Sequence, residues 1–125
     1  MVAKKKILVV EDNRPLSNAM KIQLDGAGFD VKQAYDGKEA LEKVDKDFFD
    51  LLIVDLIMPE VDGFIFISEV KKRDIKTPIM VVSNVSGEES ADRKIKTMVD
   101  TYLIKSDISL EDVVTNAKRL TGSVV

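Results

Sequence analysis

Three stretches of the chain, residues 7–10, 51–54 and 79–82, consist entirely of apolar residues. Uninterrupted apolar runs of this length are typical of strands that are buried on both faces of a parallel sheet. Residues 30–35 and 102–105 are less apolar and are predicted to form two further strands, the first of them at an edge of the sheet. Polar or charged residues stand at or just after the carboxyl ends of the apolar strands.

The segments between these strands carry apolar residues at the spacing of amphipathic helices. Gly26 and Gly28 stop the first helix, and Asp36 and Ser109 are placed to cap the second and the last. The predicted helices cover residues 16–27, 37–44, 64–72, 86–99 and 110–120. Five strands that alternate with five helices predict an α/β fold, a doubly wound (βα)5 three-layer sandwich around a five-stranded parallel sheet.

Length and composition exclude several classes of function. The 125 residues predict one domain over 1–125, and the formal net charge of -3 argues against general nucleic-acid binding. Histidine and cysteine are absent, which excludes disulfides, thiolate ligands and imidazole bases. The lysines at 4–6 precede only four apolar residues, too few for a signal peptide or a membrane span. We therefore expect a cytoplasmic protein with no membrane contact.

Chemically useful side chains stand at the carboxyl ends of four predicted strands. These residues are Glu11, Asp12, Asp55, Ser83 and Lys105. Ligands of open α/β sheets bind outside the carboxyl ends of the strands, so we expect these side chains to converge there. Carboxylates at close quarters repel one another, and hard oxygen ligands without nitrogen or sulfur favour Mg²⁺.

A Mg²⁺ ion beside Asp55 suggests phosphoryl chemistry. An ionised aspartate needs no general base to attack phosphorus, which suits a chain without histidine. Lys105 and the hydroxyl of Ser83 could hold the other phosphoryl oxygens. The sequence thus predicts Asp55, Ser83 and Lys105 as the reacting and phosphoryl-binding residues.

The chain resembles, over essentially its whole length, the receiver domain of two-component response regulators and is similar to single-domain chemotaxis regulators. The resemblance rests on an acid pair after the first strand, a phosphoacceptor motif, a switch hydroxyl, and an aromatic residue three positions before a lysine. These are Glu11-Asp12, Asp55-Leu56-Ile57-Met58-Pro59 with Asp62-Gly63, Ser83, and Tyr102 before Lys105.

Several expectations follow from the resemblance alone. It implies the strand order 2-1-3-4-5, and it implies that Asp12, Asp55 and the backbone carbonyl of Ile57 bind Mg²⁺ while Glu11 acts mainly through water. Asp55 would receive phosphate from a histidine kinase or phosphotransfer protein. Ser83 would then move to the phosphoryl group and Tyr102 would turn inward. This would alter the face of the fourth helix, fifth strand and fifth helix, where a downstream protein partner binds.

Four positions add expectations of their own. Receivers usually have proline after the strand-five lysine, often with a cis bond, whereas Ser106 stands here, so we predict a trans bond. Asn84 replaces the small residue that usually follows the switch hydroxyl. Ile57 and Val85 are apolar and cannot orient an attacking water, which predicts slow loss of phosphate without a phosphatase.

Other interpretations remain open at this stage. Taken singly, Asp12 could cap a helix and Lys105 could be a solvated surface lysine. A flavin or nucleotide module would need a Gly-, Ser- or Thr-rich loop where Glu11 and Asp12 stand. An aspartate-nucleophile phosphohydrolase would need a second acid where Ile57 stands, so turnover is poorly supported and the chain is not expected to be an enzyme. A receiver-like module that binds partners without phosphorylation is the remaining alternative.

Overall fold

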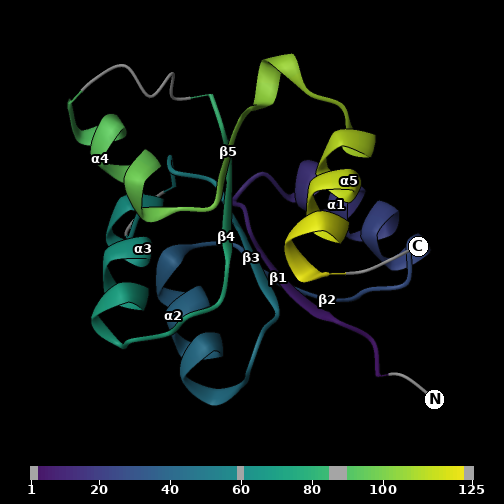
Figure 1. The fold of residues 1–125 in the computed structure, drawn as a ribbon, viewed down its shortest axis with the longest axis horizontal. Coiled ribbons are helices and arrows are strands. Elements are labelled where there is room, and N and C mark those ends of the chain that lie inside the picture. The colour runs from purple at the N-terminus through teal and green to yellow at the C-terminus, as the bar shows by residue number, and fades with distance from the viewer. Residues whose placement is uncertain (1–2, 59–60, 85–89, 123–125) are drawn as a thin grey trace.

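The computed structural model describes residues 3–58, 61–84 and 90–122 (Figure 1). Five parallel strands form one sheet in the order β2-β1-β3-β4-β5, as the resemblance implied. The strands are β1 (Lys6–Val10), β2 (Asp30–Ala34), β3 (Leu51–Val54), β4 (Ile79–Ser83) and β5 (Thr101–Ile104). The least apolar predicted strand, β2, lies at an edge, as its composition indicated.

Helices cover both faces of the sheet, which confirms the predicted three-layer α/β architecture. Their bounds are α1 (Arg14–Gly26), α2 (Gly37–Lys46), α3 (Gly63–Lys72), α4 (Ser90–Met98) and α5 (Leu110–Thr121), with a short 3₁₀ helix, η1 (Lys105–Asp107), before α5. Figure 1 shows α1 and α5 on one side of the sheet and α2, α3 and α4 on the other. The predicted start of the fourth helix, at residue 86, lies outside the described residues.

Two apolar layers, one on each face of the sheet, form the core. On one face, Phe66 and Ile67 of α3 and Ile95 of α4 pack against the buried side chains of β3 and β4. On the other face, Met20 of α1 and Val113 of α5 pack against the alternate residues of the same strands. The central strands bury both faces because helices cover each of them, which is why their sequences lack alternation.

Short polar side chains begin the helices where the sequence indicated. Asn13 accepts the Leu16 N–H at 3.0 Å and so caps α1, which leaves Asp12 with no capping role. Asp36 caps α2, and Ser109 forms a reciprocal capping box with Asp112. Asp12 is therefore available for another function.

The strand-five prediction was displaced by one residue. The strand covers Thr101–Ile104, and Lys105 is the first residue of η1. The chain turns at Lys105, so its long side chain leaves the sheet at the carboxyl edge. Among the described residues, no helix is long and apolar enough to cross a membrane.

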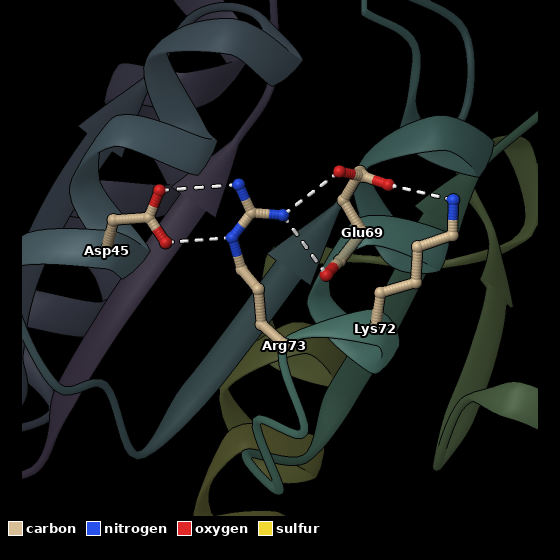
Figure 2. A network of polar contacts seen from close by, with 4 residues as sticks. All are labelled: Asp45, Glu69, Lys72 and Arg73. Carbon is tan, nitrogen blue, oxygen red and sulfur yellow. Dashed lines mark hydrogen bonds and ion pairs between the residues drawn. The ribbon is translucent and has the colours of Figure 1, made fainter.

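An exposed network of four charged side chains joins the ends of α2 and α3 (Figure 2). Arg73 binds Asp45 through Nε at 2.8 Å and through a second nitrogen at 3.3 Å, and it also contacts Glu69 Oε1 at 3.1 Å. Lys72 contacts the other oxygen of Glu69 at 3.2 Å. These helices run antiparallel to the strands, so the network lies toward the edge where the strands begin.

Candidate functional site

Three carboxylates meet at the carboxyl edge of the sheet. Glu11 and Asp12 follow β1, Asp55 follows β3, and one oxygen from each lies within 4.8 Å of the others. The parallel register pairs Val10 with Val54, which places the residues that follow these two strands side by side. Glu11 and Asp55 are 1% and 6% exposed, whereas Asp12 is exposed. The convergence predicted from the sequence is thus present in the fold.

Lys105, which directly follows β5, bridges the two buried acids. Its Nζ lies 2.7 Å from Glu11 Oε1 and 2.9 Å from Asp55 Oδ2. Glu11 Oε2 accepts the Asn13 N–H at 3.1 Å, whereas Oε1 has no hydrogen bond among the described residues beyond its ion-pair contact with Lys105. Lys105 is therefore no ordinary solvated lysine.

The environment of the cluster disfavours the negative charge of Glu11. Burial raises the pKa of Glu11 to about 7, and Lys105 only partly offsets this effect. Burial opposes the charge of Lys105 as well, but its contacts with Glu11 and Asp55 outweigh this and raise its pKa. The ammonium of Lys105 contacts Glu11 and Asp55, and Asp12 adds a third carboxylate beside them, so a further cation would relieve the remaining repulsion. Oxygen donors in this number suit a hard divalent ion such as Mg²⁺.

The loop after Asp55 is shaped by a close approach of the backbone. The Ile57 N–H lies 3.3 Å from Asp55 Oδ1, and Gly63 donates its N–H to Leu56 O at 3.0 Å. A Cβ at Gly63 would stand 2.3 Å from the backbone oxygen of Asp55, so only glycine fits. This gives the Asp62-Gly63 pair a physical role: Asp62 caps α3, and Gly63 lets the helix start beside Asp55.

Of the remaining predicted residues, the structure describes Ser83, Tyr102 and Ile57. Ser83 is fully buried at the end of β4 and pairs in register with Ile104, the residue before Lys105. Tyr102 is half-buried on β5, with the Lys96 ammonium 5.3 Å from its ring centroid, and its register partner is Val81, outside the cluster. The side chain of Ile57 is 61% exposed. Val85 and Pro59 lie outside the described residues.

The peptide bond after Lys105 is trans, as predicted, and the described residues contain no cis bond. Ser106 donates its N–H to Asn84 Oδ1 at 3.1 Å. Sequence reasoning noted both departures from the receiver pattern but missed their contact. Gly63 was noted as part of a motif, but its approach to Asp55 was missed. The hydrogen bond joins residues 22 positions apart, and the approach of Gly63 depends on α3 beginning beside Asp55, so no periodic pattern in the sequence could reveal either contact.

The chain belongs to the family of response regulator receiver domains, whose family model matches residues 7–118. It is 32% identical over 115 residues to the transcriptional regulatory protein TrcR of Mycobacterium tuberculosis, which covers 92% of this chain and 44% of that protein. The receiver fold and the resemblance drawn from the motifs are thereby confirmed. Members of this family are signalling domains and not turnover enzymes.

Solved structures of similar proteins agree with this family assignment. The chemotaxis protein CheY4 of Vibrio cholerae is 31% identical, with a TM-score of 0.81 and coverage of 94% of this chain and 99% of that one. The response regulator TrrA of Thermotoga maritima, solved in complex with Mg²⁺ and beryllofluoride, is 26% identical, with a TM-score of 0.81 and coverage of 93% and 98%.

The first curated relatives are longer than this chain, which spans 44% of TrcR and 44% of CiaR of Streptococcus pneumoniae. Both are named as transcriptional regulatory proteins. The chain therefore aligns with less than half of each regulator. The expectation that it makes no direct nucleic-acid contact remains a prediction.

Proposed function

We propose that this chain is a phosphoacceptor of a two-component system, in which Asp55 receives a phosphoryl group from a histidine kinase or phosphotransfer protein in a Mg²⁺-dependent reaction. The observation that carries the proposal is the convergence of Glu11, Asp12 and Asp55 within 4.8 Å, with Lys105 bound to both buried acids. Membership in the receiver family supports the same assignment.

The donor set fits the metal. Asp12, Asp55 and the backbone carbonyl of Ile57 would hold Mg²⁺, and Glu11 would act mainly through water. When bound, the ion supplies positive charge that neutralises the acids and the incoming phosphoryl oxygens. The raised pKa of the Glu11 carboxyl, which burial causes and Lys105 only partly offsets, supports the binding of a further cation beside the acids.

The transfer itself needs little from the protein beyond position and charge. An oxygen of the Asp55 carboxylate attacks phosphorus, and the bond between phosphorus and the imidazole nitrogen of the donor breaks as the new bond forms. Lys105 would release its contact with Asp55 and bind a phosphoryl oxygen, while the Ser83 hydroxyl would donate to another. The donor imidazole keeps the electron pair of the broken bond.

The output would be a shift between two states of the domain. Ser83 would engage the phosphoryl group and Tyr102 would turn inward, changing the face formed by α4, β5 and α5, where a downstream protein binds. Moving such an equilibrium from 1:99 to 99:1 takes about 5.5 kcal/mol of differential interaction. A phosphoryl group bound by Lys105, Ser83 and the metal supplies interactions of that order.

The phosphorylated state should be long-lived. Ile57 stands two residues after the phosphoacceptor, with a 61% exposed apolar side chain that cannot hydrogen-bond an attacking water. Val85 stands at the corresponding position after Ser83. Autodephosphorylation should therefore be slow, and the domain over 1–125 would act as a cytoplasmic signalling unit without turnover of substrate.

One measurement tests the proposal. The protein is incubated with phosphoramidate or acetyl phosphate and Mg²⁺, and its intact mass is compared with that of Asp55→Asn and with an EDTA control. The wild type should gain one phosphoryl group, and both controls should gain none. No gain in the wild type would favour the alternative of a receiver-like module that binds partners without phosphorylation. Equal gain in EDTA would refute the metal dependence.

A further inference from the structure

The two positions that depart from the receiver pattern around the phosphoryl-binding residues contact each other. Asn84 directly follows Ser83, and Ser106 directly follows Lys105. Asn84 Oδ1 accepts the Ser106 backbone N–H at 3.1 Å. One hydrogen bond thus joins the residue that follows Ser83 to the residue that follows Lys105.

This bond continues the pairing of β4 and β5 beyond the sheet. The last register pair of the two strands is Ser83 with Ile104. Past that pair, β5 turns into η1, a helix of only three residues, and β4 has ended at Ser83. The hydrogen bond from the Ser106 N–H to Asn84 Oδ1 therefore joins the segments that follow β4 and β5, where the regular strand pairing has ended.

The chemistry of the two positions is interdependent. A proline at 106, as receivers usually have, lacks an N–H and could not donate to Asn84. A small apolar residue at 84 could not accept from Ser106. The Ser106 hydroxyl is not required, because the donor is the backbone. The contact therefore needs a side-chain acceptor oxygen at 84 and any residue except proline at 106.

We infer that Asn84 is a positioning residue that replaces the proline constraint: through Ser106, it sets the place of Ser83 relative to Lys105. On the other side Lys105 is held by Glu11 and Asp55, so the Asn84 bond completes the restraint on the turn that carries it. Displacement of a phosphoryl-binding group by about 1 Å is enough to slow transfer substantially. This inference rests on the proposed phosphoacceptor function of Asp55.

The test compares four variants with the wild type. Asn84→Leu keeps the side-chain size and removes the acceptor, Ser106→Pro removes the donor, and a double variant combines them. Ser106→Ala is the matched control, because it keeps the backbone N–H. The measured quantities are the rate of phosphorylation by phosphoramidate at saturating Mg²⁺, the Mg²⁺ dissociation constant, and the hydrogen exchange of the residue 106 amide where one is present.

Loss of one hydrogen bond of ordinary strength corresponds to about a threefold to tenfold change. We expect Asn84→Leu and Ser106→Pro to slow phosphorylation by this factor and to leave the Mg²⁺ dissociation constant unchanged, because Asn84 is not one of the acids that would bind the ion. Ser106→Ala should behave as the wild type. The double variant should be no slower than the slower single variant, because both remove the same bond.

An Asn84→Leu variant as fast as the wild type, or faster, would overturn the inference. So would a double variant whose losses multiply, since the two residues would then act independently. The exchange measurement does not depend on phosphorylation: the Ser106 amide should exchange faster in Asn84→Leu than in the wild type. A wild type that is not phosphorylated at all would refute the proposed function itself, and the exchange result would still show whether the bond exists.

Discussion

Two groups of charged side chains, one toward the amino ends of the strands and one at their carboxyl ends, differ in how well their charges are balanced. The network of Arg73, Asp45, Glu69 and Lys72 pairs two cations with two carboxylates, and all four side chains are solvent-accessible (Figure 2). Its contacts lower the pKa of both Asp45 and Glu69, chiefly through hydrogen bonds from Arg73 and Lys72. Each carboxylate there is stabilised in its charged form.

Glu11 in the acid cluster shows the reverse. Two buried carboxylates share the ammonium of Lys105, a third carboxylate lies beside them, and the pKa of Glu11 is raised to about 7 because burial dominates. The same residue types thus form a balanced network in one place and an under-neutralised site in the other. Strongly perturbed ionisable groups collected in this way are typical of functional sites. The difference separates a structural ion network from a candidate functional site.

The largest expected effect separates the two groups by activity. Asp12→Ala should abolish Mg²⁺-dependent phosphorylation, whereas Asp45→Ala should leave its rate unchanged, because only Asp12 contributes a carboxylate to the site. Asp12→Ala should also leave the domain folded, since removing a like charge relieves repulsion. Intact-mass kinetics and thermal unfolding measure both results. Phosphorylation of Asp12→Ala at the wild-type rate would contradict the assignment of this acid to the site.

The second expected effect is a pH dependence of opposite sign in the two groups. Between pH 4.5 and about 7, folded Glu11 keeps a proton that unfolded Glu11 has lost, so the free energy of unfolding should fall as the pH rises through this window. The fall should be of the order of 3 kcal/mol at most. Asp45 and Glu69 have lowered pKa values, so their contribution is instead lost as the pH falls below about 4.5.

Urea unfolding of the metal-free protein at several pH values measures these slopes. Glu11→Gln should flatten the slope between pH 4.5 and 7, because the variant cannot titrate. Glu69→Gln should leave that slope intact and reduce the loss of stability at acid pH. A slope that survives Glu11→Gln would show that another group causes it.

The third expected effect compares how much Lys105 and Arg73 contribute to the free energy of unfolding. Lys105→Met leaves two buried carboxylates without their ammonium, which should lower the free energy of unfolding by about 2 kcal/mol. The loss is not larger because Glu11 can take up a proton and lose its charge. Arg73→Met should lower it far less, because Asp45 and Glu69 remain hydrated. Unfolding of both variants at pH 7.5 without Mg²⁺ measures the difference. Equal losses would mean that burial of the acid cluster does not matter to stability.

The smallest effect concerns the apolar surface beside the site. Ile57→Asn should speed loss of the phosphoryl group by about tenfold, because a polar side chain there orients the attacking water. Ile65→Asn is the matched control: Ile65 is also an exposed isoleucine, 48% accessible, but it lies in α3. The measurement is the decay of the phosphorylated mass after removal of the phosphoryl donor. Equal rates in Ile57→Asn and the wild type would show that this side chain does not restrict water.

Local sequence was enough for the elements and their order along the chain. Apolar runs at residues 51–54 and 79–82 predicted buried strands, and Asp36 and Ser109 cap helices as their positions indicated. These features depend on neighbours a few residues away, so the sequence carries them directly. The strand order and the roles of the site residues came from the family resemblance instead.

Tertiary structure alone decided how the strand ends meet. Lys105 lies 50 residues from Asp55 in sequence yet contacts it at 2.9 Å, and this contact with its burial determines the charge balance of the site. The one-residue displacement of β5 and the bond from Ser106 to Asn84 likewise depend on segments brought together by the sheet. The close approach of Gly63 to Asp55 depends on α3 beginning beside the end of β3. Such contacts leave no periodic signal in the sequence, because register and backbone packing are collective properties of the folded chain.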